Sequence, residues 1–235
     1  RMYDSDYQGK DYIHPKRGST DYLTKRELEH IRALYAGEVS FVDKWVGLLL
    51  DKIRELGFFN NSIVVFLSDH GEPLGEHGVI LKEARCMHPE LIKIPLLVRH
   101  PRGPHGKRIS EFVQTQDFAC TMLNMLDISV SPEMHGENFW TLVTGDRKRL
   151  RDRIFCGFHF TWGEKQGQVR KWEERQYICV RDKSWSLILA PKGEEPKLFH
   201  LPSDPHEMNN VYKTCSGQAQ EMKQCLDKFL RGVKE

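Results

Sequence analysis

The side chains best suited to chemistry lie within residues 63–82. An apolar run at 63–67 ends just before Asp69, His70 and Gly71. A run without polar alternation predicts a strand buried on both faces, and open α/β sheets bind ligands beyond the carboxyl ends of such strands. A carboxylate beside an imidazole at that position forms half of a metal site. Four more titratable side chains follow within about one loop, namely Glu72, Glu76, His77 and Lys82.

This stretch resembles the sulfatase branch of the alkaline-phosphatase superfamily. In that family a buried strand ends in S-D-N-G or S-D-H-G, and G-E-H-G and a lysine often follow. The resemblance implies that Asp69 and His70 bind a divalent cation, usually calcium. It implies that Lys82 contacts the sulfate and stabilises the charge that develops during transfer. His77 is the second candidate catalytic residue, and it would support Asp69, His70 and Lys82 without binding the metal itself. The alternative role for His77 is to form hydrogen bonds only within its own loop.

The expected chemistry favours the same cofactor. Transfer of a sulfate or phosphate group builds up negative charge, and a divalent cation and a lysine neutralise that charge where it develops. Oxygen ligands with an occasional imidazole suit calcium, magnesium or manganese better than zinc. Such an ion takes about six ligands, so further carboxylates must come from outside Asp69 and His70. Glu72 and Glu76 are expected to organise the loop.

The resemblance extends over most of the chain. Residues 113–128 are similar to a helical phrase of the family, V-Q-T-x-D-x-x-x-T-x-L-x-x-x-x-I. Residues 135–139 are similar to the H-G-x-S/N-L/F turn that follows it, and residues 198–210 to the L-Y-D-L-x-x-D-P-x-E-x-x-N turn. The match therefore does not rest on one motif.

Several family features are missing from the sequence. No cysteine has the C-x-P-S-R or C-x-A-S-R context in which sulfatases form formylglycine, their nucleophile. The first metal aspartates of the family and its D-P-H-x-P histidine are also missing. The chain therefore resembles the C-terminal half of a sulfatase, with the N-terminal half as its partner and a sulfate ester as its substrate. The alternatives are a phosphodiester or phosphonate monoester hydrolase of the same superfamily, and a module without catalysis.

The hydrophobic pattern predicts an α/β fold. A capping box at Thr24 and Glu27 opens a helix that carries apolar residues at helical spacing and closes at Gly57. A second apolar strand is expected at 94–98, and a helix at 114–126 with Phe118, Met122, Met125 and Leu126 on its buried face. Closely spaced strands are then expected at 154–160, 176–181, 184–190 and 197–201, with a last helix from Ser216.

These elements predict two parts. Residues 1–146 form part of an alkaline-phosphatase-like mixed sheet flanked by helices. Residues 147–235 form a small antiparallel sheet packed with a terminal helix.

Composition limits the classes of partner. The 235 residues carry a formal charge of +2 with acids and bases interspersed, so neither nucleic acid nor a membrane is expected as a partner. The apolar runs are far shorter than the roughly 20 residues of a membrane span. Six cysteines without C-x-x-C pairs argue against structural zinc. They favour reduced thiols in a cytosolic enzyme over disulfides, with a secreted or periplasmic location as the alternative.

Overall fold

The computed structural model describes residues 2–83, 85–157, 177–191 and 193–232. The chain divides into two compact units, Arg1–His105 and Gly106–Glu235. The domain boundary expected after residue 146 stays a prediction. Within the described part of the chain, no helix is long and apolar enough to cross a membrane.

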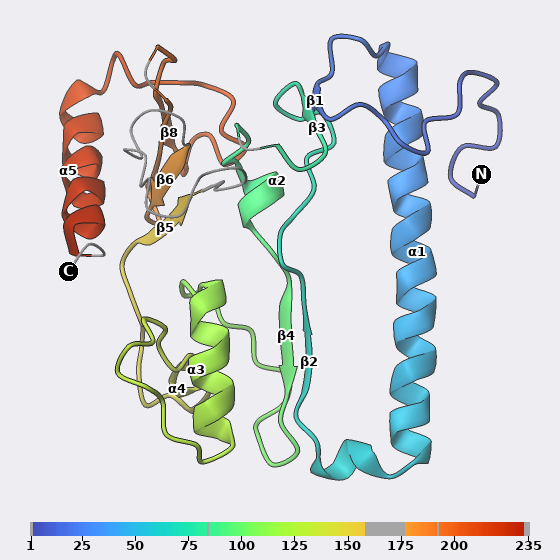
Figure 1. Ribbon diagram of the computed structural model, residues 1–235, viewed down its shortest axis with the longest axis vertical. Helices are drawn as coiled ribbons and strands as arrows, with labels where there is room; N and C mark the ends of the chain where they lie inside the picture. The colour runs from blue at the N-terminus through green and yellow to red at the C-terminus, as the bar shows by residue number, and fades with distance from the viewer. Residues whose placement is uncertain (1, 84, 158–176, 192, 233–235) are drawn as a thin grey trace, which may run out of the picture. The chain divides into compact units, whose positions relative to one another are not determined.

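The first unit is built on one long helix, α1 (Lys25–Glu55), shown in Figure 1. Its 31 residues correspond to a length of about 45 Å. The predicted capping box is confirmed, because the Thr24 hydroxyl accepts from the Glu27 N–H and the Glu27 carboxylate accepts from the Thr24 N–H. The helix ends at Glu55 with Leu56 as its C-cap, and Gly57 follows with a φ of 78°.

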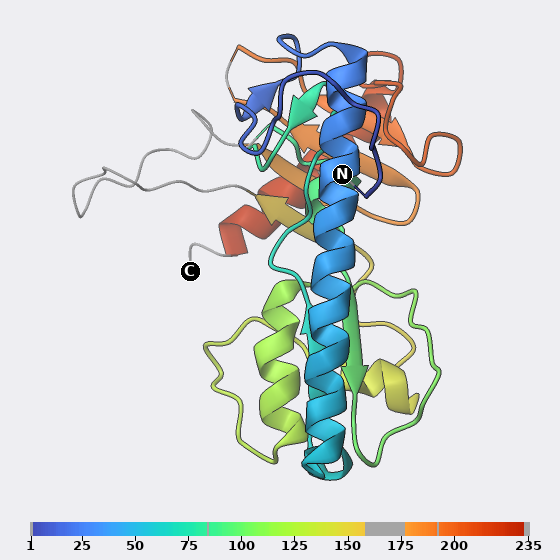
Figure 2. The ribbon, with the colours of Figure 1, turned by 90° about the vertical axis from the view of Figure 1, so that its right-hand side faces the viewer.

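The segment before α1 is irregular apart from the short strand β1 (Gly18–Ser19). Figure 2 shows it looping beside the first turns of the helix. Asp4 accepts hydrogen bonds from Arg26 and, at 2.8 Å, from His30 Nδ1, while Tyr7 stacks on the His30 ring at 3.7 Å. The hydrogen bond from Arg26, with that from His30, lowers the pKa of Asp4 to about 2.

Most of the apolar residues on α1 are exposed. Only His30 and Ile31 are buried in this helix. Tyr35, Trp45 and Leu49 expose 42%, 55% and 59% of their surface. The helical periodicity was therefore predicted correctly, but among the described residues little packs against the apolar face.

The strand that leads to the candidate site is β2 (Val64–Leu67), which pairs antiparallel with β4 (Leu96–Arg99). The 3-10 helix η1 (Phe58–Asn61) joins α1 to β2, and the Arg99 guanidinium lies 3.8 Å from the Phe59 ring centre. The prediction that β2 is buried on both faces is wrong. Phe66 and Leu67 are 43% and 38% exposed, because β2 has one paired neighbour among the described strands.

Two short elements close the loop after β2. Strand β3 (Val79–Ile80) pairs antiparallel with β1, and Ile80 is fully buried. The short helix α2 (Pro89–Ile92) follows. Together they fold residues 71–82 back beside the end of β2.

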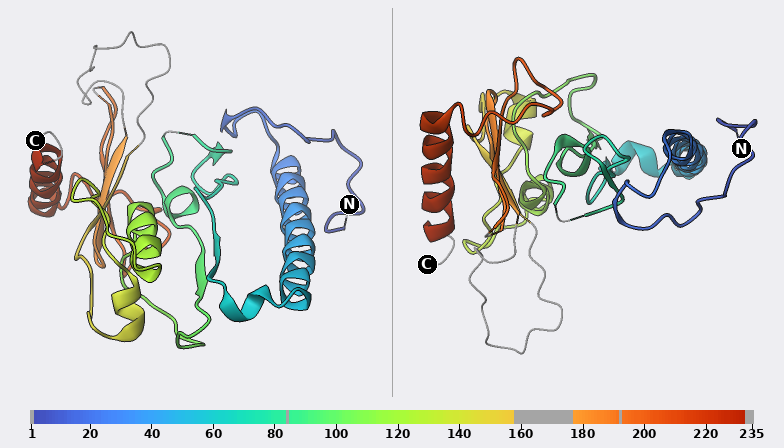
Figure 3. Two further views of the ribbon diagram at one scale, coloured as in Figure 1. Left: turned by 60° about the horizontal axis from the view of Figure 1, so that its bottom comes forward. Right: turned by 90° about the horizontal axis from the view of Figure 1, so that it is seen from above.

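The second unit contains the predicted antiparallel sheet. Its strands are β5 (Ile154–Gly157), β6 (Ile178–Arg181), β7 (Trp185–Leu189) and β8 (Lys197–His200), in that spatial order. Helix α5 (Ser216–Gly232) covers one face of this sheet, as Figure 3 shows. The core between them contains Val180, Leu187, Leu198, Met222 and Leu226. Residues 158–160 and 176 of the predicted strands lie outside the described residues.

The second unit begins with α3 (Thr115–Met125) and α4 (Trp140–Thr144). The buried residues of α3 are Asp117, Cys120 and Thr121, while Leu126 is 59% exposed. The predicted apolar face of α3 is therefore wrong at Leu126, while Phe118, Met122 and Met125 are half-buried. Asp117 lies in the first turn, where it is fully buried and accepts hydrogen bonds from Arg151.

All six cysteines are free in the structure. Cys156 on β5 lies directly opposite Cys179 on β6. Burial raises the pKa of Cys156 to about 11 and that of Cys179 further still.

Candidate active site

The turn after β2 brings two metal-binding side chains together. The Ser68 hydroxyl donates to the His70 carbonyl at 2.6 Å, and the His70 N–H donates to Asp69 Oδ1 at 3.0 Å. These bonds place Asp69 Oδ2 3.6 Å from His70 Nε2. The Asp69 side chain is 84% exposed, so its outer oxygen is open to a ligand. The two donor atoms are close enough to contact one cation between them.

A main-chain contact fixes which nitrogen of His70 is available. His70 Nδ1 lies 2.7 Å from the Gly71 carbonyl oxygen, which can only accept a hydrogen bond. Nδ1 therefore carries the proton, and neutral His70 presents a lone pair at Nε2. A hydrogen bond of this kind orients a histidine that binds a metal.

Gly71 lies tight against α2. Its N–H donates to the Leu91 carbonyl at 2.7 Å. A Cβ atom at position 71 would lie 2.0 Å from the Glu90 carbonyl oxygen. Since any larger residue would collide with this main chain, the glycine lets the turn pack directly on α2.

Lys82 lies near the same turn. The Glu72 carboxyl accepts a hydrogen bond from the Lys82 main chain. Burial raises the pKa of Glu72, while the charges of His70, Lys82 and Arg17 oppose that rise. Sequence reasoning missed Arg17. The pairing of the next residue, Gly18, with Ile80 brings it here, and no local sequence signal marks that pairing.

His77 is held inside the loop. Its Nε2 lies 3.4 Å from Glu90 Oε2, and its ring stacks on His88 at 3.6 Å with 9° between the planes. The His77 side chain is 10% exposed. Sequence reasoning also missed His88 and Glu90, because the fold alone brings them to His77. Glu76 accepts from the Leu74 N–H at 2.7 Å, which is the loop-organising role predicted for it.

Within the described residues, no group of three or more His, Cys, Asp or Glu side chains is arranged to hold a metal ion. The donor atoms of Asp69 and His70 fit a divalent cation by type and separation, but they form only part of a coordination shell.

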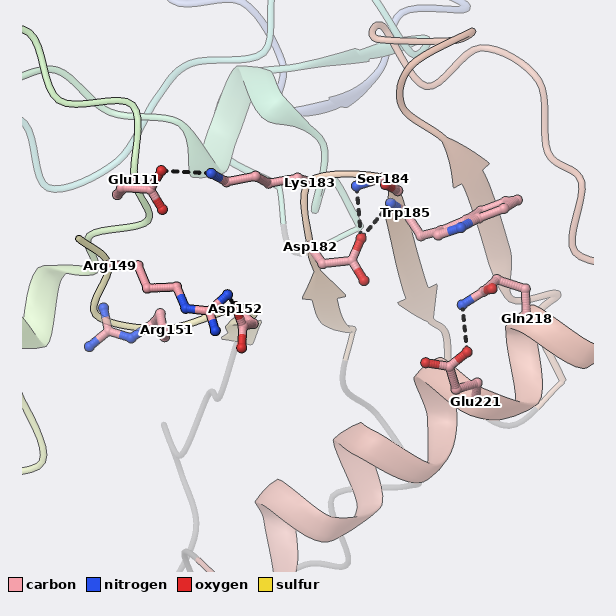
Figure 4. Close-up of a pocket in the computed structure, with 10 residues that line it drawn as sticks. All are labelled: Glu111, Arg149, Arg151, Asp152, Asp182, Lys183, Ser184, Trp185, Gln218 and Glu221. Carbon is pink, nitrogen blue, oxygen red and sulfur yellow. Dashed lines mark hydrogen bonds and ion pairs between the residues drawn. The ribbon is translucent and has the colours of Figure 1, made fainter.

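The second unit has a pocket of its own, of about 390 Å³, shown in Figure 4. Its charged groups form ion pairs, two of them between lining residues. Lys183 Nζ lies 2.7 Å from Glu111 Oε1, and Arg149 lies 2.6 Å from Asp152 Oδ1. None of the predicted site residues lines it. The lining residues are Glu111, Arg149, Arg151, Asp152, Asp182, Lys183, Ser184, Trp185, Gln218 and Glu221.

Two family models match the chain. One is described as N-sulphoglucosamine sulphohydrolase, C-terminal, and covers residues 75–235. The other is described as Sulfatase and covers residues 3–128. Together they span both units and include the turn after β2.

Individual known proteins that are similar to this chain are also described as sulfatases or related hydrolases. Arylsulfatase K of Xenopus laevis is 29% identical over 235 residues, which are 99% of this chain and 41% of that protein. A crystal structure described as a sulfatase from Bacteroides thetaiotaomicron superposes with a TM-score of 0.79 at 20% identity, over 90% of this chain and 45% of the other. A phosphonate monoester hydrolase from Silicibacter pomeroyi superposes with a TM-score of 0.74 at 20% identity, over 89% and 42%. The chain thus spans less than half the length of each of these proteins.

Proposed function

The chain belongs to the sulfatase family, and we propose that it supplies the C-terminal half of a metal-dependent enzyme that hydrolyses sulfuric esters. The observation that carries this proposal is the turn after β2. Asp69 Oδ2 and His70 Nε2 lie 3.6 Å apart there, and the Asp69 carboxylate is open to solvent. This arrangement offers one oxygen and one nitrogen ligand to a single divalent cation, most often calcium in this family, with magnesium or manganese as alternatives.

In this proposal each residue has one role. Asp69 and His70 hold the cation, which when bound supplies positive charge to the sulfate group. Lys82 contacts the sulfate and stabilises the negative charge that develops on it. His77, packed between Glu90 and His88, positions the loop that carries Lys82.

No cysteine has the context required for the formylglycine nucleophile, and within the described residues no further ligand completes a metal site with Asp69 and His70. We therefore expect no turnover from this chain alone. The N-terminal half of the same enzyme is the partner that would complete the site.

A second candidate function is phosphonate monoester hydrolysis. The superposition on a phosphonate monoester hydrolase, with a TM-score of 0.74, supports it because the two chains share a fold. The choice between sulfur and phosphorus depends on residues around the nucleophile. Assays of the complete enzyme on an aryl sulfate and on an aryl phosphonate monoester would decide between these functions.

The proposed metal site is tested by calcium titration calorimetry on this chain. We expect weak binding, with a Kd on the order of 10⁻⁴–10⁻³ M, as for partly completed or weak calcium sites. Asp69→Ala should abolish it, because it removes the only carboxylate of the pair. Asp51→Ala is the matched control, since the Asp51 side chain is 73% exposed, against 84% for Asp69, and pairs with Arg54 on α1. Equal binding by both variants would place calcium elsewhere.

Activity gives a separate test. The pure chain is assayed with an aryl sulfate in excess calcium, and no product above the uncatalysed rate is expected. Rapid hydrolysis that Asp69→Ala removes would contradict the proposal that the nucleophile lies on another part of the enzyme.

A further inference from the structure

A strained residue comes directly before the lysine of the candidate site. Leu81 has a φ of 61°, and the only other non-glycine residues with a positive φ in the described part of the chain are Asp127 and Glu207. The left-handed conformation brings the Cβ atom of an L-residue too close to a carbonyl oxygen, so it costs free energy in residues other than glycine. Such residues persist where the surrounding structure enforces them, and they cluster at functional sites.

The surrounding loop folds back on itself and holds Leu81 in this conformation. Leu74 pairs with Ile80 in an antiparallel bridge. The Leu81 N–H donates to the Pro73 carbonyl at 3.0 Å. Pro73 and Ile80 are both fully buried, so close packing keeps them from shifting to relieve the strain. One hydrogen bond and two buried neighbours therefore fix the main chain at residue 81.

The next residue along this loop is Lys82. Its main-chain N–H donates to the carboxyl group of Glu72, which lies two residues after His70. In a regular strand, successive side chains point to opposite faces. The positive φ of Leu81 breaks that alternation and turns the chain immediately before Lys82. The conformation of residue 81 therefore decides the direction in which Lys82 leaves the loop, relative to the turn after β2.

We propose that Leu81 is a positioning residue, whose left-handed main chain directs the Lys82 amine toward the sulfate group. The proposal rests on the function proposed above, in which Lys82 stabilises the charge that develops during transfer. A group with that role needs a fixed position, because misplacement by about 1 Å can cost roughly 100-fold in rate. This role gives a reason for a strained main chain at a position where an extended residue would simply continue the strand.

Two substitutions in the complete enzyme separate the main-chain conformation from the packing of the side chain. Leu81→Ile keeps the side-chain volume, but a β-branched residue resists a positive φ. Its kcat for an aryl sulfate should fall about 10–100-fold, with KM unchanged because Lys82 acts in the transition state. Leu81→Gly removes the side chain and permits the conformation, so kcat should stay close to the parent value. A large loss of kcat in Leu81→Gly would overturn the proposal, whether or not Leu81→Ile folds.

A double variant tests whether Leu81 acts through Lys82. Residues that act as a unit have non-additive effects. Leu81→Ile should therefore cost no further activity in an enzyme that already carries Lys82→Ala. The same fold-loss in both backgrounds would show that Leu81 acts independently of the lysine and would overturn the proposal.

Asp127→Ile is the matched control. Asp127 also has a positive φ, of 56°, and it lies in the second unit. Asp127→Ile and Leu81→Ile should both lower the thermal unfolding midpoint, but only Leu81→Ile should lower kcat when both enzymes are assayed well below their midpoints. An equal loss of kcat in the two variants would trace the effect to general destabilisation and overturn the proposal. A parent enzyme that hydrolyses no sulfuric ester would count against the proposed function itself.

Discussion

At the scale of single residues, the glycine of the S-D-H-G turn is required for space. Gly71 has no positive φ, so its backbone conformation is open to other residues. The constraint comes from the Glu90 carbonyl, 2.0 Å from where a Cβ would lie. The neighbouring metal ligands therefore depend on how closely α2 approaches the turn.

This contact predicts the effect of Gly71→Ala. The new methyl group must push α2 away from the turn, and overpacking of this kind costs about 1–3 kcal/mol. Urea unfolding of the chain measures the loss. Gly47→Ala is the control, because Gly47 lies in α1 with nothing within 4 Å of a Cβ. That change should raise stability by about 0.5–1 kcal/mol. Equal stability of Gly71→Ala and the parent would mean that α2 moves freely.

Asp4 predicts a pH dependence. Its pKa is about 2 in the folded chain, below the ordinary 3.8, chiefly because Arg26 hydrogen-bonds the carboxylate. A lowered pKa contributes stability above the unfolded value, and that contribution is lost as pH falls toward the folded value. Asp4→Asn should therefore be less stable than the parent at pH 6, and the difference should shrink from about pH 4 downward toward pH 2. Urea midpoints at pH 6 and pH 3 measure this, and a constant difference would contradict it.

At the scale of elements, the N-terminus of α3 depends on one buried carboxylate. Asp117 accepts from the Gln114 and Glu137 N–H groups at 2.7 and 2.8 Å and from Arg151 Nη2 at 2.6 Å. It is fully buried, while Arg151 is 14% exposed. The carboxylate thus joins the start of α3, the segment before α4 and the approach to β5.

We expect Asp117→Ala to destabilise the second unit by about 3–5 kcal/mol, because it removes the buried carboxylate that Arg151 hydrogen-bonds and leaves the guanidinium the longer, 3.5 Å ion pair with Glu137. Chemical unfolding followed by circular dichroism measures the change. Asp152→Ala is the control, since the Asp152–Arg149 pair is 70% and 65% exposed and should contribute at most about 1 kcal/mol. A similar small effect of both changes would mean that water replaces the carboxylate.

Sequence reasoning succeeded where the cause of an element is local. The capping box at Thr24, the turn after Leu67 and the closely spaced strands of the second sheet all follow from neighbouring residues. It failed where burial depends on distant partners. β2 is exposed because little of the described chain packs on it, and α3 buries Asp117 because Arg151, 34 residues away, neutralises it. Arg17 and His88 reach the candidate site through pairings that no spacing reveals.

At the scale of the whole molecule, the proposed function couples metal binding to association with the N-terminal half of the enzyme. Each piece would hold only part of the coordination shell, so calcium should strengthen their association by the same factor by which association strengthens calcium binding. We expect a gain of roughly 5–150-fold in excess calcium over EDTA. Asp69→Asn should weaken the calcium dependence and leave the calcium-free Kd unchanged. Identical Kd values for the parent in calcium and in EDTA would mean that calcium binding and association are not coupled.

Cys156 on β5 and Cys179 on β6, which lie opposite each other, can report when the sheet of the second unit opens. Thiolates react with alkylating reagents and thiols do not. With the pKa of Cys156 near 11 and that of Cys179 higher, few thiolates exist at pH 8 until the strands separate. The alkylation rate of these two positions, read by mass spectrometry, would therefore time the opening of the sheet in the unaltered protein. Such a measurement could follow how firmly this sheet stays closed as partners and ions are added.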